Sequence, residues 1–313
     1  MNVGELNRTD AIHRLRTNGL PVRVGPFAMN FKTNVKGLAA AIHYLYADFS
    51  LVDDPDFIDF RVSLMHAGGF RRWILPYMTF IAEGTLLFRQ VPVNAAVPYW
   101  EWGMNRCIAI FAQHYLILHA AVVERNGNAM VIVGGSGSGK STLCSGLAFN
   151  GWRLLSDELT MLSTEDHRIT AVARPITLKN ESLDIVPRFG SDVKMGPKSE
   201  GTIKGTVAHV KPPMDSIRRG DERATPGWFV FVNYEPGAAT QLEPVTKAQA
   251  VMKIAHNAFN YGMLGVDGFQ SLTQIVDRCD CCALTYSDLD DAISLFNSDQ
   301  FGKRNSVEFC EAV

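Results

Sequence analysis

The segment Gly134–Thr142 carries the residues whose types and spacing point most directly to a chemistry. It begins GGSGSGKS, which matches the pattern G-x-x-x-x-G-K-[ST] at every position. Glycines at these positions let the backbone curl so that successive N–H groups face phosphate oxygens, and the helix that follows adds the positive end of its dipole. The pattern therefore predicts a nucleotide-binding phosphate loop, in preference to an accidental glycine-rich turn.

The loop residues divide the work of binding a triphosphate. Lys140 can reach the β- and γ-phosphates, and the Ser141 hydroxyl can ligate Mg²⁺. We therefore expect ATP and Mg²⁺ as cofactors, while GTP or pyrophosphate stays open as the donor. The predicted nucleotide-binding residues are Gly134, Gly135, Ser136, Gly137, Ser138, Gly139, Lys140, Ser141 and Thr142.

Two acids and one histidine are the candidates for chemistry beyond binding. Asp157 and Glu158 follow an expected short strand at Arg153–Ser156, where one carboxylate can hold Mg²⁺ and another can accept the proton of an attacking hydroxyl. The alternative is that one of them caps the next turn. His119 ends an apolar run one strand before the loop, and a lone histidine in such a run is commonly a core residue. A functional role for it needs separate support.

That support comes from a resemblance. Three segments together resemble the core of the HPr kinase/phosphorylase family: His119–Val122, Val131–Thr142 and Gly151–Glu158. Within the family the chain is more similar to the HPr-kinase-related proteins, which include kinases of peptide-modification systems, than to the authentic HPr enzyme. The resemblance extends over about residues 113–296, and its most specific part is 119–158.

The resemblance implies roles for single residues. By it, His119 contacts the transferring phosphate, Lys140 stabilises its charge, Ser141 and Asp157 hold Mg²⁺, and the acid pair also serves the substrate hydroxyl. The family has two aspartates where this chain has Asp157 and Glu158, so which of the two is the base stays open. The glycine-rich signature that follows the nucleotide site in the authentic enzymes is not found here. Its absence argues against phosphorolysis and against HPr as the substrate.

The elements that must position these residues follow from the pattern of the sequence. Apolar strands are expected before the loop, with an Asn-Gly turn between them, and a helix is expected after it. Strands, loop and helices in this order predict a sheet with helices packed on it. The expected strands are Leu116–Val123, Ala129–Val133, Trp228–Asn233 and Cys281–Tyr286; the expected helices are Glu101–Tyr115, Ser141–Phe149, Thr246–Tyr261 and Ser287–Phe296; and Pro187–Thr206 is expected to be a mobile loop.

The length of 313 residues suggests two domains. We expect a small α+β domain of unassigned role at 1–112 and a kinase domain at 113–313. By the resemblance, the fold class is α/β: an HPr-kinase-type P-loop nucleotide-binding domain with a mixed sheet, behind the small α+β domain.

Composition limits the partners. A net charge of −2 gives no general attraction to nucleic acid or anionic membrane, and the apolar run Cys107–Val123 is too short and too polar to span a bilayer. Six cysteines are sparse for this length, and the N-terminus lacks an apolar signal core, so we expect a cytoplasmic protein. The expected partner is a small protein or peptide substrate. Members of the family form oligomers, so the resemblance allows a homo-oligomer.

The function predicted from these patterns is a kinase that transfers the γ-phosphoryl group to a serine, or another hydroxyl, of a small protein or peptide. Two alternatives remain: a nucleotide-gated switch or assembly ATPase without an acceptor, and a kinase for a small metabolite. Cations outside the loop are weaker candidates for phosphate contacts, the alternative being solvated loop residues. These are Arg174, Lys179, Lys211, Arg218 and Arg219.

Overall fold

The computed structural model describes residues 1–52, 57–66, 77–298 and 301. Its chain forms two compact units, each made of discontinuous segments. The first consists of Met1–Phe111, Arg174–Pro187 and Ser191–Arg218, and the second of Ala112–Ala173, Arg188–Gly190 and Arg219–Val313. The predicted division into 1–112 and 113–313 therefore differs from these units, because most of the stretch from Arg174 to Arg218 packs with the first unit.

The second unit is built on one mixed sheet. Its strands are β6 (Tyr115–Arg125), β7 (Asn128–Val133), β8 (Arg153–Ser156), β9 (Leu159–Ser163), β10 (Ile169–Thr170), β14 (Thr225–Tyr234), β15 (Gln241–Pro244) and β16 (Asp280–Tyr286). In the described part of the unit their order is β10-β9-β6-β7-β14-β16-β15, and β8 also pairs with β6. β7, β14 and β16 are parallel, whereas β6 runs antiparallel to β7. A mixed sheet with helices packed on it agrees with the fold class expected from the sequence.

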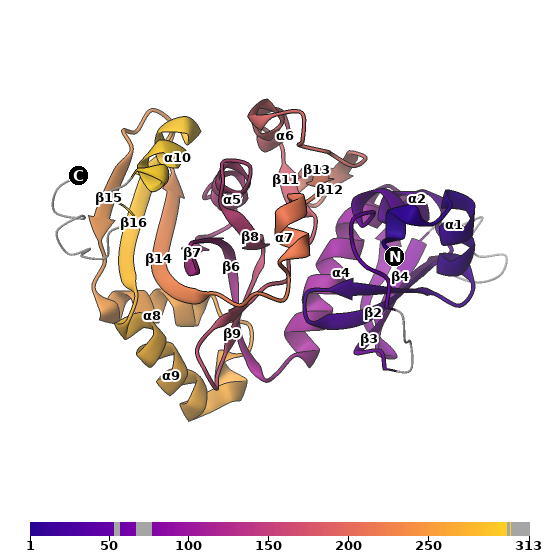
Figure 1. Ribbon diagram of the computed structural model, residues 1–313, viewed down its shortest axis with the longest axis horizontal. Helices are drawn as coiled ribbons and strands as arrows, with labels where there is room; N and C mark the ends of the chain where they lie inside the picture. The colour runs from indigo at the N-terminus through magenta and orange to yellow at the C-terminus, as the bar shows by residue number, and fades with distance from the viewer. Residues whose placement is uncertain (53–56, 67–76, 299–300, 302–313) are drawn as a thin grey trace. The chain divides into compact units, whose positions relative to one another are not determined.

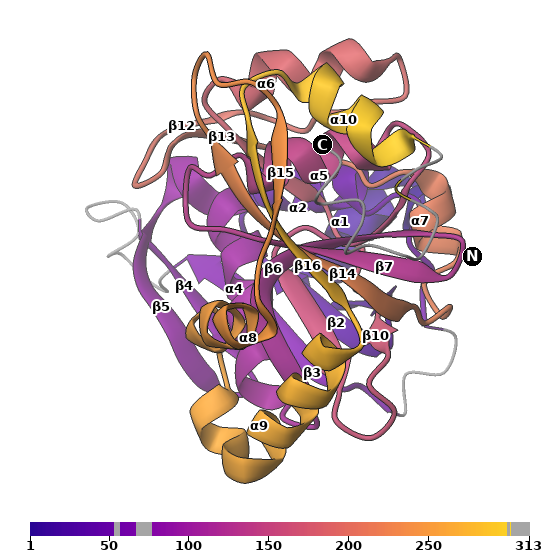
Figure 2. The ribbon, with the colours of Figure 1, turned by 90° about the vertical axis from the view of Figure 1, so that its left-hand side faces the viewer.

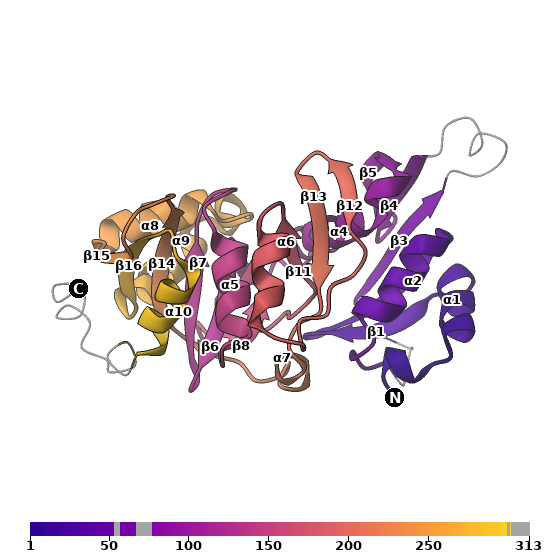
Figure 3. The ribbon, with the colours of Figure 1, turned by 90° about the horizontal axis from the view of Figure 1, so that it is seen from above.

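Helices cover both faces of this sheet (Figure 3). They are α5 (Lys140–Ala148), α8 (Lys247–His256), α9 (Tyr261–Asp277) and α10 (Leu289–Asn297). On one face α5 contacts β6, β7, β8 and α10. On the other face α8 and α9 pack on a core that includes Phe229, Phe231, Ile254 and Leu272. The phosphate-loop helix and the α8–α9 pair are thus separated by the sheet.

Local sequence explains the two elements nearest the loop. Asn126 and Gly127, between β6 and β7, have φ of 53° and 81°, the combination that a two-residue hairpin of matching twist requires. β14 is buried without interruption from Pro226 to Val232, as expected for a central parallel strand covered on both faces. Figure 2 shows β14 between β7 and β16 in the twisted sheet.

The first unit combines a five-stranded mixed sheet with a smaller antiparallel one (Figure 1). The larger sheet contains β1 (Leu20–Val24), β2 (Phe27–Thr33), β3 (Phe60–His66), β4 (Tyr77–Ala82) and β5 (Thr85–Pro92), and the smaller contains β11 (Ile176–Lys179), β12 (Ser199–Thr202) and β13 (Gly205–Val210). The α-helices in the described part of this unit are α1 (Arg8–Arg16), α2 (Lys36–Leu45), α4 (Ala96–Phe111), α6 (Ser182–Ile185) and α7 (Met214–Arg218). Short 3-10 helices occur at η1 (Val3–Glu5) and η2 (Val93–Ala95), and η3 (Val186–Phe189) begins in this unit and ends in the second.

Three predicted elements differ from the structure. Pro187–Thr206 is not a structureless loop, because it contains β12 and the start of β13, whose pairing its glycines and polar residues concealed. The predicted helix Thr246–Tyr261 ends early: α8 spans Lys247–His256, residues 257–260 are not helical, and α9 begins only at Tyr261. The predicted helix ending at Tyr115 stops at Phe111, and Tyr115 already belongs to β6.

No helix in the described ranges is both long enough and apolar enough to cross a membrane.

A buried ion pair lies inside the first unit. Arg174 Nη1 is 2.8 Å from Glu101 Oε2, and both side chains are almost fully buried. Tyr46 Oη donates to Glu101 Oε1 at 2.8 Å, and Arg174 also donates to the Asn105 side chain. Burying a charge is costly unless it is paired and hydrogen-bonded, so these partners stabilise one another. Arg174 therefore has a structural role here, in contrast to the phosphate contact considered from the sequence.

Removing one charge of this pair should destabilise the protein strongly. We expect Arg174→Met to lower the free energy of unfolding by about 3–5 kcal/mol, because the Glu101 carboxylate stays buried without its partner. Exposed Arg14 is the matched control, and Arg14→Met should change stability by no more than about 0.5 kcal/mol. Denaturant unfolding measures both values. Equal effects of the two substitutions would contradict the assignment.

The first unit also buries a neutral histidine. His209 of β13 is fully buried, and neither ring nitrogen has a hydrogen-bond partner among the described residues. Burial, then the charges of Arg174 and Lys179, lowers the pKa of His209 to about 3. In the unfolded chain a histidine has a pKa of about 6.5, so below that pH the unfolded state binds more protons than the folded state.

Stability should consequently fall as the pH falls from about 6.5 toward 3. The contribution of neutral His209 is fully present above about pH 6.5, and its loss by pH 5 amounts to about 2 kcal/mol. His209→Leu should flatten the pH dependence of the unfolding free energy over this range. His13→Ala, at an exposed site on α1, should leave it unchanged. The same slope in wild type and His209→Leu would refute the prediction.

Candidate functional site

The predicted phosphate loop connects β7 to α5. β7 ends at Val133 and α5 begins at Lys140, so residues 134–139 form the connection, as the sequence predicted. Gly137 and Gly139 have φ of 86° and 85°, which side chains of L-residues rarely adopt. Because Gly139 is the N-cap and has no side chain, it cannot cap the first N–H groups of α5. Those groups are suited to bind an anion.

The backbone of the loop is closely surrounded. A Cβ atom on Gly134 would lie 2.3 Å from Ser138 Oγ, and one on Gly139 would lie 2.2 Å from Tyr286 Oη. Tyr286 Oη donates to the Gly139 carbonyl at 3.0 Å, and the Tyr234 N–H donates to the Ser138 carbonyl at 3.0 Å. The ends of β14 and β16 therefore hold the second half of the loop. Burial raises the pKa of Tyr286, so its hydroxyl stays a donor.

Lys140 reaches back across the loop. Its side chain is buried, and its Nζ lies 3.3 Å from the Gly134 carbonyl oxygen and 3.4 Å from His119 Nε2. An ammonium group only donates hydrogen bonds, so Nε2 is the acceptor of this pair. The structure thus brings Lys140 and His119 together, although they are 21 residues apart in sequence.

His119 is positioned by its strand and by the chain after α8. It pairs with Leu159 of β9, and its N–H donates to the Asn257 carbonyl at 2.7 Å. The imidazole ring lies 5.7 Å from the ring of Phe259. Its half-buried side chain is therefore not a residue of the closed core, which was the alternative considered from the sequence.

The acid pair lies in the link between two strands that both pair with β6. Ser156 of β8 is opposite Val122 and Leu159 of β9 is opposite His119, so Asp157 and Glu158 flank β6 beside the histidine. Asp157 is buried and Glu158 is half-buried. The two carboxylates therefore differ in solvent exposure, and such a difference would suit one of them to bind a metal ion and the other to accept a proton.

The pKa of Cys144 in α5 responds to both Asp157 and Lys140. Burial, then the Asp157 carboxylate, raises the pKa of Cys144, while Lys140 acts in the opposite direction. Its Sγ lies 3.9 Å from the Ser156 carbonyl oxygen, which places the end of β8 against α5. Asp157 and Lys140 thus both act on one side chain of the loop helix. Ser141 and Thr142, in the first turn of this helix, are half-buried.

Two of the other cations considered from the sequence, Lys211 and Arg219, form ion pairs elsewhere. Lys211 Nζ lies 2.6 Å from Asp48 within the first unit, and Arg219 of the second unit lies 2.7 Å from Glu222. With Arg174, three of these cations have carboxylate partners. Among the residues that the structure describes, no such pair is present for Lys179 or Arg218.

Sequence reasoning missed the residues that support the loop. The predicted strands ended at Asn233 and Tyr286, and nothing in the sequence connected Tyr234 or Tyr286 with the loop. Asn257 and Phe259 lay inside a predicted helix. No spacing pattern connects them to the loop, because they reach it from distant parts of the chain. Within the described residues no group of three or more His, Cys, Asp or Glu side chains is arranged to hold a metal ion.

Comparisons with known proteins found similarity to solved structures and to nothing else that was compared. No protein-family model matches the chain, and no curated protein matches it. Among solved structures, the chain is similar to the Hpr(Ser) kinase/phosphatase from Coxiella burnetii, with 10% sequence identity and a TM-score of 0.26. The similarity covers 60% of this chain and 99% of that one.

A side chain at Gly139 should damage nucleotide binding. Gly139→Ala combines a strained φ with a contact to Tyr286 Oη, so the loop must shift, and we expect affinity for a non-hydrolysable ATP analogue to fall at least about tenfold. Gly237→Ala is the matched control, since φ there is 80° but the added Cβ meets no atom within 4 Å. It should keep the affinity. Titration calorimetry measures both, and equal affinities would contradict the assignment.

Proposed function

We propose that this protein is an ATP- and Mg²⁺-dependent kinase that transfers the γ-phosphoryl group to a serine, or another hydroxyl, of a small protein or peptide. The observation that carries the proposal is the approach of Lys140 Nζ to His119 Nε2 and to the Gly134 carbonyl oxygen. A loop that only binds phosphate needs the lysine. A histidine and a buried acid beside it suit transfer.

The residues present fit a triphosphate. At Gly135 and Gly137 an added Cβ would meet no protein atom within 4 Å, so the backbone there is open to a ligand, and the first turn of α5 offers N–H groups without a side-chain N-cap. Lys140 supplies a positive charge at the start of the loop. In the proposal, Ser141 and Asp157 hold Mg²⁺, which neutralises phosphate charge when it is bound.

In the proposed transfer, different side chains accept the proton and stabilise the charge. The substrate hydroxyl oxygen forms a bond to the γ-phosphorus, the bond from that phosphorus to the β-bridging oxygen breaks, and ADP leaves. The hydroxyl proton goes to a carboxylate of the Asp157–Glu158 pair. Lys140 stabilises the charge on the transferring group, His119 contacts that group and orients Lys140 through Nε2, and positioning by the loop supplies much of the rate.

Separating transfer from binding tests the proposal. His119→Ala and Asp157→Asn should keep the affinity for ATP within a few-fold and lower phosphotransfer about 10²–10⁴-fold, because they remove groups that act on the reacting atoms. Lys140→Ala should weaken binding as well. The matched controls are His114→Ala and Asp166→Asn, at partly or fully exposed positions outside the loop.

The measurement uses γ-labelled ATP, Mg²⁺ and candidate serine peptides. Label in the peptide supports the proposal. Steady ATP hydrolysis with no labelled acceptor would instead favour a nucleotide-gated ATPase and would end the kinase assignment.

A further inference from the structure

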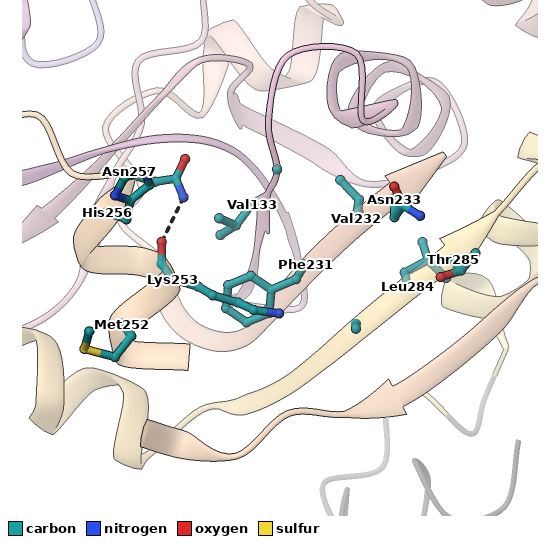
Figure 4. A pocket seen from close by; sticks show the side chains of 12 residues that line it. Val133, Phe231, Val232, Asn233, Met252, Lys253, His256, Asn257, Leu284 and Thr285 are labelled. Carbon is teal, nitrogen blue, oxygen red and sulfur yellow. Dashed lines mark hydrogen bonds between the residues drawn. The ribbon is translucent and has the colours of Figure 1, made fainter. Parts of the chain in front are cut away.

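A cavity of about 600 Å³ lies at the carboxyl ends of β7, β14 and β16, on the face of the sheet that carries α8 (Figure 4). Val133 and Phe231 come from the strands, and Met252, Lys253 and His256 come from α8. The loop helix α5 lies on the opposite face. A cavity at the ends of parallel strands is a common position for a ligand.

The cavity borders both groups that the proposed transfer uses. Gly134 lines it, and the Gly134 carbonyl accepts from Lys140 Nζ at 3.3 Å. Asn257 lines it as well, and the Asn257 carbonyl accepts the N–H of His119 at 2.7 Å. The cavity therefore adjoins the start of the loop, where Lys140 and His119 meet, whereas Tyr286 contacts the loop at its far end.

The cavity is lined mostly by apolar side chains, and Lys253 adds a positive charge on the α8 side. Phe231 and Leu284 supply apolar surface, and Lys253 Nζ lies 4.9 Å from the centre of the Phe231 ring. His256 is one turn further along α8, and none of the described residues that line the cavity carries a carboxylate. Such a site suits an apolar side chain with a negative group beside it.

Exposed apolar side chains continue beyond the cavity. Met252, which lines it, is 73% exposed, and Phe259, which contacts the His119 ring, is 53% exposed. Met263, Val266 and Phe269 of α9 are exposed too, at intervals of three residues. Exposed apolar surface of this kind marks interaction sites, and methionines suit adaptable ones. A free metabolite that fits the cavity does not reach this surface, whereas a peptide does.

We propose that this cavity binds the acceptor peptide: an apolar side chain next to the phosphorylated serine enters it, and a neighbouring carboxylate pairs with Lys253 and His256. The serine hydroxyl then lies at the junction of His119 and Lys140. This assignment rests on the kinase function proposed above and adds the substrate class, a serine peptide with apolar and acidic flanking residues.

A positional-scanning library of serine peptides with γ-labelled ATP tests the assignment. Wild-type protein should select an apolar residue and an acidic residue near the serine. Lys253→Glu should replace the acidic preference by a basic one, a change that a merely structural lysine would not produce. Arg278→Glu, an equal charge change at an exposed site after α9, should keep the wild-type preference.

Filling the cavity gives a second, independent reading. Ala283→Phe should raise KM for the selected peptide at least about tenfold, with the affinity for a non-hydrolysable ATP analogue within about twofold of wild type. If both cavity variants keep the wild-type preferences and KM, the assignment is wrong while the kinase function stands. If Ala283→Phe weakens the ATP analogue and leaves the peptide KM unchanged, the cavity is a nucleoside site and the assignment is also wrong. If wild-type protein labels no peptide, the kinase function fails and takes the assignment with it.

Discussion

The backbone of residues 134–139 is the constraint on which the candidate site depends. A glycine-rich loop between a strand and a helix has few backbone hydrogen bonds of its own, so other elements must hold it. Tyr286 and the N–H of Tyr234 do so through the carbonyls of Gly139 and Ser138. Tyr234 ends β14, which pairs with β7, and Tyr286 ends β16, which pairs with β14 in parallel, so the loop is tied to the centre of the sheet.

The mixed order of the sheet brings the reactive side chains to this loop. β6 runs antiparallel to β7, so a residue early in β6 lies near the end of β7, where the loop starts. His119 is such a residue, and Lys140 meets it there. β8 and β9 both pair with β6, and their short link places Asp157 and Glu158 at the same edge. A wholly parallel arrangement would carry His119 to the other end of the sheet.

The cationic side chains of the protein differ in their partners. Arg174 is bound to Glu101 in a buried network, and Lys211 lies against Asp48. These pairs stabilise the first unit, since a buried charge without its partner is costly. Lys253 is different, because it extends over the Phe231 ring at the cavity on the α8 face. It is a cation placed where a ligand can reach it.

The sequence by itself determined the glycine-rich loop at 134–139, the hairpin before it and the helix after it, because glycine positions and short-range periodicity decide such elements locally. It also placed Asp157 directly after a strand. Only the tertiary structure decided that Pro187–Thr206 contains paired strands, that Arg174 is buried against Glu101, and that a cavity adjoins His119. Each of these depends on residues far apart in the chain, whose contact no local pattern records.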